Sequence, residues 1–136
     1  MQARQERERA RPRIVIASSE YNSLLALAEK ASEKDSRVGD YLASELSRAS
    51  IVPDGAAAPN VVRMGSIVTY REDATSRVRK VTLVYPKDAD IDRNCISVLT
   101  PIGAALIGLA PDQTIDWPSP AGAMESLTVV SVENEA

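Results

Sequence analysis

Few side chains in this sequence are suited to covalent or metal chemistry. Among its 136 residues the chain has one cysteine, Cys95, and no histidine. Histidine is the usual base that activates a cysteine nucleophile and the commonest ligand of transition metals. We therefore expect no catalytic residue, no metal site and no cofactor. Cys95 is interpreted as a small apolar side chain at the start of a strand.

The most distinctive segment runs from Thr100 to Gly108, where a threonine–proline pair precedes small and apolar residues. The Thr100 hydroxyl is suited to cap a short helix over residues 102–107. Pro101 suits the first helical position because that position needs no N–H. Gly108 is typical of a helix end. Taken alone, these residues indicate a capped helix packed on a sheet, without a binding role.

Two amphipathic segments lie earlier in the chain. Apolar residues recur at helical spacing over residues 21–31 and again over residues 37–50, and a polar break separates the two segments. We predict an antiparallel helical hairpin over residues 14–52, with helices of about 12–16 residues that are about 18–24 Å long. Ser18 and Ser19 are the expected N-caps of the first helix.

Residues 53–60 contain two prolines and a glycine and are predicted to be a linker between two domains. Beyond this linker the apolar pattern becomes alternating, which is typical of strands. Strands are predicted over residues 67–71, 78–85, 96–99, 115–117 and 127–132. Residues 61–136 are thus expected to form a domain of strands around one short helix, which makes the whole chain an α+β protein.

Charge is unevenly distributed along the chain. The net charge is −3 and the pI is near 5.0, which disfavours a dedicated nucleic-acid-binding protein. Residues 1–13, however, hold five arginines and two glutamates. We interpret them as a mobile arm, with a weak nucleic-acid contact as the alternative. The basic cluster Arg77, Arg79 and Lys80 is interpreted as a solvated strand face, with contact to acidic or phosphate groups as the alternative.

The sequence also predicts where the protein is found. No apolar run is long enough to cross a bilayer, and the N-terminal residues are polar. A lone cysteine cannot form a disulfide within the chain, as expected in a reducing compartment. We predict a cytoplasmic protein that is a monomer and makes no membrane contact.

Four separate motifs, in the same order along the chain, carry a family resemblance. They are Leu42-x-x-Glu45-Leu46-x-Arg48-Ala49, Val61-Val62-x-Met64, the strand from Val81 to Pro86, and the run from Pro101 to Leu106. Through them the chain resembles the GreA/GreB transcription elongation factor superfamily, and within it most closely the Rnk branch (regulator of nucleoside diphosphate kinase). The resemblance extends from Ile14 to Val132.

The resemblance implies both a fold and a partner. The second domain is expected to have the FKBP-like fold of the Gre C-terminal domain, a twisted antiparallel sheet against one short helix. In that family this domain docks on bacterial RNA polymerase at the rim of the secondary channel. The matching contact residues here are Leu99, Thr100, Pro101, Ile102, Ala105 and Leu106. Leu99 stands where the cleavage factors have an aspartate, so a contact made by that carboxylate is missing.

Cleavage factors of this family use a longer hairpin, whose tip carries two acidic residues to a catalytic Mg²⁺. The tip predicted here contains Glu33, Asp35, Arg37 and Asp40, with the acidic residues interleaved among basic ones. Their spacing differs from the paired acids of the family, and the hairpin is shorter. We therefore expect solvated turn residues at the tip, not metal ligands.

The leading hypothesis is a non-enzymatic regulator that binds RNA polymerase, competes with Gre-type factors and does not cleave RNA. One alternative is a stimulator of transcript cleavage that acts through the acidic residues of the tip. Another is a protein-interaction module that regulates nucleoside diphosphate kinase. FKBP-like folds also include prolyl isomerases with aromatic pockets, but this chain has no phenylalanine and one tryptophan. Trp117 is interpreted as a core or sheet-face residue.

Overall fold

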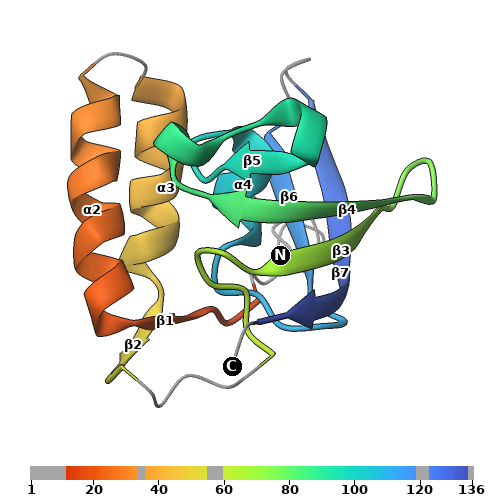
Figure 1. Ribbon diagram of the computed structural model, residues 1–136, viewed down its shortest axis with the longest axis horizontal. Coiled ribbons are helices and arrows are strands. Elements are labelled where there is room, and N and C mark those ends of the chain that lie inside the picture. Colours follow the sequence, from red (N-terminus) through yellow and green to blue (C-terminus); the bar gives the residue numbers. More distant parts are fainter. Residues whose placement is uncertain (1–11, 34–35, 55–59, 119–122, 135–136) are drawn as a thin grey trace, which may run out of the picture.

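A helical hairpin stands beside a five-stranded sheet, and the sheet curves around one short helix (Figure 1). The computed structural model describes residues 12–33, 36–54, 60–118 and 123–134. The arrangement confirms the predicted α+β class with an N-terminal hairpin. Most of the arginine-rich arm, Asp35 and most of the predicted linker lie outside the described residues.

The hairpin consists of α2 (Ser18–Ser32) and α3 (Ser36–Ser47), which run antiparallel and side by side (Figure 1). With 15 and 12 residues, the two helices have the predicted lengths. Their fully buried apolar side chains are Leu24, Ala28, Leu42 and Leu46. All four lie in the two segments whose apolar residues were found to recur at helical spacing, so this spacing correctly identified core residues of the hairpin.

The two helices of the hairpin approach each other closely at Gly39. A Cβ atom added at Gly39 would lie 2.6 Å from the amide nitrogen of Ser32 and 2.9 Å from the carbonyl oxygen of Ala28. Next to this contact, the Ser32 hydroxyl donates a hydrogen bond to a carboxylate oxygen of Asp40 (2.9 Å). Glycine therefore permits the tight contact, and Asp40 links the two helices across it.

The start of α2 differs from the prediction. Its N-cap residue is Ala17, and Ser18 and Ser19 lie inside the first turn. The carboxylate of Asp54 instead accepts the Ser19 N–H (3.0 Å) and the Ser18 hydroxyl (3.4 Å). Hydrogen bonds from Ser19 and Ser18 lower the pKa of Asp54. The predicted N-caps are thus wrong, because an acceptor far along the chain satisfies the first turn.

A second difference lies at the end of the hairpin. The helix predicted to reach residue 50 ends at Ser47, because β2 (Ser50–Val52) pairs in parallel with β1 (Val15–Ala17). The Ser50 N–H also donates to the carbonyl oxygen of Ile14 (2.9 Å). The helical spacing continues through Ala49, which is why the sequence suggested a longer helix. The strand pair joins the two ends of the hairpin.

Glu45 and Arg48, both part of the Rnk-like motif, hold the end of α3 against the chain that enters β1. Glu45 is only 1% exposed, and its Oε1 lies 2.6 Å from Nη2 of Arg48. Nη1 of Arg48 donates to the carbonyl oxygen of Pro12 (2.5 Å). A buried carboxylate requires such a partner, because removal from water penalises the charge. The motif therefore has a structural role.

The sheet has the strand order β5-β4-β3-β7-β6. Its strands are β3 (Ile67–Glu72), β4 (Arg77–Val84), β5 (Cys95–Ser97), β6 (Thr114–Pro118) and β7 (Met124–Glu133). All neighbours pair antiparallel except β4 and β5, which are parallel, so the predicted antiparallel sheet is mixed at one edge. Between these two strands, outside the predicted strands, lie the 3-10 helices η1 (Pro86–Asp88) and η2 (Ile91–Arg93).

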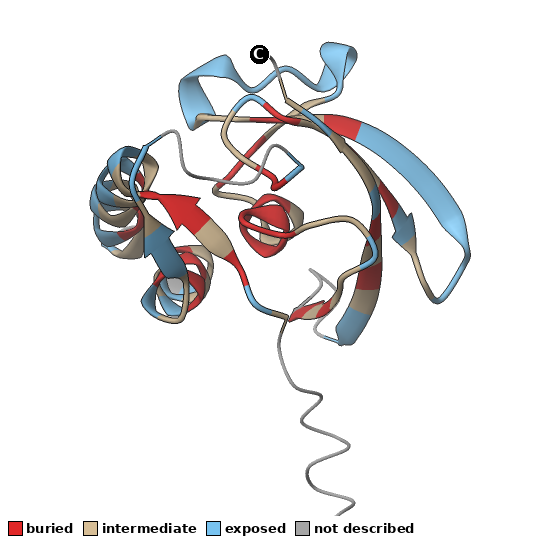
Figure 2. Cartoon of the chain, turned by 90° about the horizontal axis from the view of Figure 1, so that it is seen from below, coloured by how far each residue is buried: buried red, intermediate tan, exposed pale blue. Residues whose placement is uncertain are grey.

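The short helix α4 (Pro101–Leu106) lies inside the curve of the sheet (Figure 2). Every residue from 103 to 107 is buried. The hairpin packs on α4 through α3, and β6 also contacts α4. Apolar side chains of the hairpin, β1, the sheet and α4 form a single cluster, so the two predicted domains share one core. The boundary at residues 53–60 stays a prediction.

We expect Asp54→Ala to lower the free energy of unfolding, because the Ser19 N–H in the first turn of α2 loses its acceptor. The folded-state pKa of Asp54 is lowered, so its stabilisation is present above the ordinary pKa of 3.8 and is lost as the pH falls through the lower folded value. Urea denaturation at several pH values should show the deficit of the variant shrinking in acid.

Asp88→Ala, which removes an exposed aspartate of η1, is the control for this measurement and should change little. A deficit of Asp54→Ala that stayed constant between neutral pH and strong acid would contradict the proposed role of the carboxylate.

Candidate functional site at the Thr100 corner

The turn that leads from β5 into α4, residues 97–102, is called the Thr100 corner. The carbonyl oxygen of Ser97 accepts both the N–H (3.1 Å) and the hydroxyl (2.7 Å) of Thr100. The Thr100 hydroxyl oxygen accepts the Gly103 N–H (3.0 Å), and Pro101 opens the helix, so the predicted cap and helix start are confirmed. The Ser97 hydroxyl accepts the Leu99 N–H (2.9 Å). These bonds leave the corner little freedom to move.

Gly103 makes the corner tight. A Cβ atom added there would overlap the carbonyl oxygen of Ser97 and would lie 2.9 Å from the Thr100 hydroxyl oxygen. The same carbonyl already accepts two hydrogen bonds from Thr100 and cannot move away without breaking them. A glycine is therefore required for the turn of the chain from β5 into α4.

Four of the six predicted contact residues reach the surface. Leu99, Thr100, Pro101 and Ile102 are partly exposed. Ala105 and Leu106 are 0% exposed, because this face of α4 is turned into the shared core. A partner of the folded protein cannot touch these two side chains, so their inclusion in a docking surface was wrong. The exposed part of the corner remains a candidate.

A hollow of about 370 Å³ opens beside the corner, between α4 and the concave face of the sheet. Its apolar lining consists of Tyr70, Val81, Ile91, Ile96, Pro101, Ile102 and Trp117. Tyr70 and Trp117 are 2% and 6% exposed and form its floor, whereas Ile91 of η2 is 87% exposed and stands at its rim. We call this site the corner hollow. Its size and lining suit an apolar side chain of a partner.

Sequence reasoning missed the corner hollow. Ile91 was assigned no role, and Trp117 was interpreted as a core or sheet-face residue without a neighbouring cavity. A signal was present in Ile91, a lone large apolar residue in the charged run from Lys87 to Arg93. Its place beside Pro101 follows from the parallel pairing of β4 with β5, which the sequence did not reveal.

Polar groups lie at the rim of the corner hollow. Oε2 of Glu72 and Nε of Arg79 form an ion pair (2.9 Å), and both side chains are partly exposed, so the pair adds little stability. Burial raises the pKa of the Tyr70 phenol. Within the described parts of the chain, no group of three or more metal-binding side chains is found. The hollow offers a partner apolar surface with one ion pair at its edge.

The predicted hairpin tip is described in part. Glu33, Arg37 and Asp40 are exposed, whereas Asp35 lies outside the described residues. The Asp40 carboxylate accepts the hydrogen bond from Ser32 that links the two helices. Asp40 thus has a structural task at the tip.

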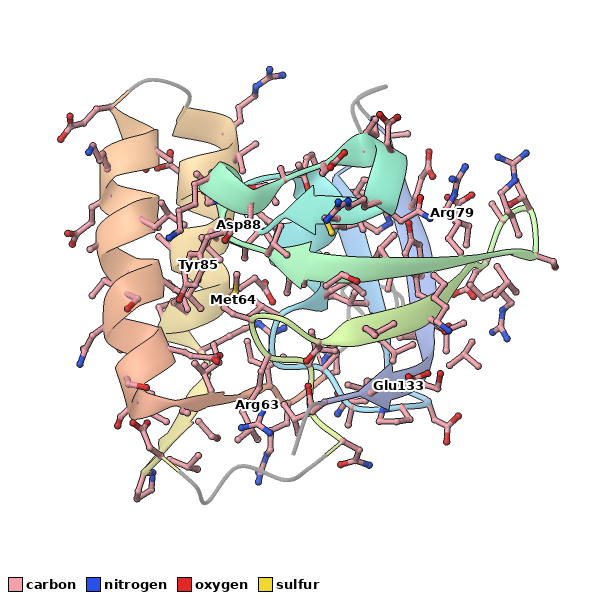
Figure 3. The ribbon with its side chains drawn as sticks, viewed as in Figure 1. Arg63, Met64, Arg79, Tyr85, Asp88 and Glu133 are labelled. Atoms are coloured by element: carbon pink, nitrogen blue, oxygen red, sulfur yellow. The ribbon has the colours of Figure 1, made fainter. Side chains whose placement is uncertain are left out.

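Contacts between the hairpin and the sheet fix the hairpin relative to the corner. Met64 and Tyr85 lie between the two parts of the molecule (Figure 3). Glu20 of α2 accepts the Met64 N–H (3.4 Å). Burial raises the pKa of Glu20, while the Met64 hydrogen bond and the Arg63 charge partly offset the rise. Burial also raises the pKa of Tyr85, and a hydrogen bond with Ser23 of α2 opposes that effect.

Comparison with known proteins places this architecture in a family. Residues 57–134 match the family described as transcription elongation factor, GreA/GreB, C-terminal, and residues 12–52 match the Rnk N-terminus. A "Regulator of nucleoside diphosphate kinase" from Escherichia coli (strain K12) is 33% identical over 124 residues, which cover 91% of each chain. Transcription elongation factor GreA from Roseiflexus castenholzii is 36% identical over 90 residues, 66% of this chain and 57% of that protein.

A solved structure supports the same assignment. The prokaryotic transcription elongation factor GreA/GreB from Nitrosomonas europaea matches with a TM-score of 0.70 and 38% identity, over 90% of this chain and 100% of that chain. The chain therefore belongs to the GreA/GreB transcription elongation factor family, in its Rnk branch. The relatives are named as regulators and elongation factors, which are not classical enzymes. No helix in the described ranges is both long and apolar enough to span a bilayer.

Thr100→Val removes the hydroxyl that joins the Ser97 carbonyl to the Gly103 N–H and keeps the branched shape. We expect the free energy of unfolding to fall by about 1–2 kcal/mol, as for other lost helix caps. Thr100→Ser keeps the hydroxyl and should cost about 0.5 kcal/mol or less. Urea denaturation of the three proteins measures both differences, and equal losses would argue against capping.

Proposed function

We propose that this protein binds bacterial RNA polymerase at the rim of the secondary channel, through the exposed part of the Thr100 corner and the corner hollow. The observation that carries this proposal is the position of the hollow, which opens directly beside Thr100, Pro101 and Ile102. The family resemblance assigns these residues to polymerase contact. Membership of the GreA/GreB family supports the same partner.

The proposed contact is mainly apolar. Leu99 stands where the cleavage factors carry an aspartate, so packing takes the place of that charged contact. Ile91 and Ile102 line the corner hollow together with the buried side chain of Trp117. An apolar side chain that fills the hollow would remove this surface from water, which contributes about 25 cal/mol for each Å² of apolar area before the entropic cost of association is subtracted. Such a buried centre is typical of residues that dominate binding energy.

The hairpin gives the reason to propose regulation without transcript cleavage. Helices of 15 and 12 residues are about 22 and 18 Å long at 1.5 Å per residue. Of the acidic residues at the tip, Asp40 accepts a hydrogen bond from Ser32 that links the two helices, and Glu33 has basic neighbours in the sequence. Hard oxygen ligands must reach the metal in a set geometry to assist hydrolysis. We propose that the protein occupies the rim and competes with Gre-type factors there.

The binding proposal predicts that Ile91→Asp and Ile102→Asp each weaken polymerase binding roughly tenfold or more, because a charge replaces apolar surface at the hollow. Titration of polymerase with the labelled protein measures the affinity. Ile51→Asp is the matched control, since Ile51 is 48% exposed on β2 and does not line the hollow. If both hollow variants stay folded and bind normally, the proposed surface is excluded.

The regulatory proposal predicts no transcript shortening when the protein is added with Mg²⁺ to backtracked polymerase complexes. A GreA protein is the positive control in the same assay. Increasing amounts of this chain should reduce GreA-stimulated cleavage, and Ile91→Asp should not. Rapid shortening that Glu33→Ala or Asp35→Ala abolishes would instead establish the protein as a cleavage stimulator.

The name of the Escherichia coli relative favours a second candidate, regulation of nucleoside diphosphate kinase by direct binding. Pull-down of purified kinase and purified polymerase by the same immobilised chain separates the two candidates. Retained kinase with no retained polymerase would favour the second candidate over the first.

A further inference from the structure

The outer half of β4 has an unpaired edge. The β3–β4 hairpin projects beyond the rest of the sheet (Figure 1), and this half of β4 is exposed (Figure 2). On the side away from β3, β5 pairs only with residues 82–84 of β4. No strand of the described chain pairs with residues 77–81 on that side. We call this segment the open edge.

The open edge presents backbone donors and acceptors in a known order. The register of β3 with β4 is unbroken from Glu72–Arg77 to Ile67–Thr82. The Thr82 N–H points away from β3, since it donates to the carbonyl oxygen of Asn94 (2.8 Å). Because backbone groups alternate along an antiparallel strand, those of Val78 and Lys80 also point away from β3. These two residues therefore supply free N–H and C=O groups to a further strand.

The side chains of the open edge are basic. Arg77, Val78, Arg79 and Lys80 are all exposed. Arg79 pairs with Glu72, and Lys80 lies 3.9 Å from Glu133 with both side chains more than half exposed, which is a weak ion pair. Within the described residues Arg77 makes no ion pair. Figure 3 shows Arg79 on the projecting hairpin, far from α2 and α3.

These charges select among the strands that could pair with the open edge. Lysine and arginine on an exposed edge repel a second copy of the same edge, which prevents self-association. An acidic strand would be attracted instead, through cross-strand pairs of opposite charge. A nucleic-acid strand could neutralise the cations, but its phosphates are acceptors only. They would leave the carbonyl oxygens of Val78 and Lys80 without donors.

We propose that the open edge binds an extended, acidic segment of a partner protein, which adds to the sheet as a strand beside β4. Its backbone pairs with Val78 and Lys80, and its carboxylates at alternate positions face Arg77 and Arg79. Arg79 and Val81 also line the corner hollow, so the added strand passes along its border. The inference does not depend on polymerase binding.

The test uses the full chain and a short peptide that alternates glutamate and valine, blocked at both ends. Amide hydrogen exchange, followed by NMR, should slow roughly tenfold at Val78 and Lys80 when the peptide binds. The amides of Arg79 and Val81 already face β3 and should change little. The same peptide with lysine in place of glutamate, and a single-stranded DNA oligonucleotide, are compared at low salt, where charge attraction is strongest.

Two variants make the test specific. Val78→Pro removes an N–H that points away from β3 and should weaken peptide binding roughly tenfold, since proline is tolerated on an edge strand. Arg77→Glu should weaken binding through charge, because its side chain lies on the face proposed to meet the carboxylates, whereas Lys87→Glu, a charge reversal on exposed η1, should not. The proposal is overturned by absence of binding, by binding without protection at Val78 and Lys80, or by tighter binding of the lysine peptide or the oligonucleotide.

Discussion

The packing of α4 is the constraint on which the rest of the structure depends. There is no room for a side chain at Gly103, where the chain enters the helix, or at Gly108, where it leaves. Gly108 has a φ of +82°, and an added Cβ would lie 2.8 Å from Cβ of Ile14. Its carbonyl oxygen accepts the Val15 N–H (3.2 Å), and its N–H donates to Val62 (3.0 Å). β1, the sheet and the hairpin thus all contact the short segment formed by α4 and Gly108.

This constraint also defines the candidate site. Because α4 is enclosed on all sides after its first turn, only the corner that opens the helix is left at the surface. The buried residues behind the corner, Ala105 and Leu106, hold it in place without being available to a partner. A corner anchored in the core presents Pro101 and Ile102 in one fixed geometry, so little conformational entropy is lost when a partner binds.

Much of this could be predicted from the sequence, for local reasons. Helical and alternating spacing gave the hairpin and most strands, and the Thr100–Pro101 pair gave the start of α4, because each depends on neighbouring residues. The capping of α2 by Asp54, the pairing of β2 with β1 and the place of Ile91 beside Pro101 depend on contacts between distant residues. A single sequence does not contain that information in local form. The burial of Ala105 and Leu106 was missed because both faces of α4 are covered.

The parallel pairing of β1 with β2 has a consequence for how such proteins vary. The two strands join the ends of the hairpin at its base, and at the same end of α2 the Asp54 carboxylate accepts a hydrogen bond from the Ser19 N–H. At the opposite end, the described residues form no strand pair, and a side-chain hydrogen bond from Ser32 to Asp40 links the two helices. Whole helical turns can therefore be added or removed at the tip while the base and the corner stay unchanged. The length of the helical hairpin and the structure at its base can therefore change independently within this fold.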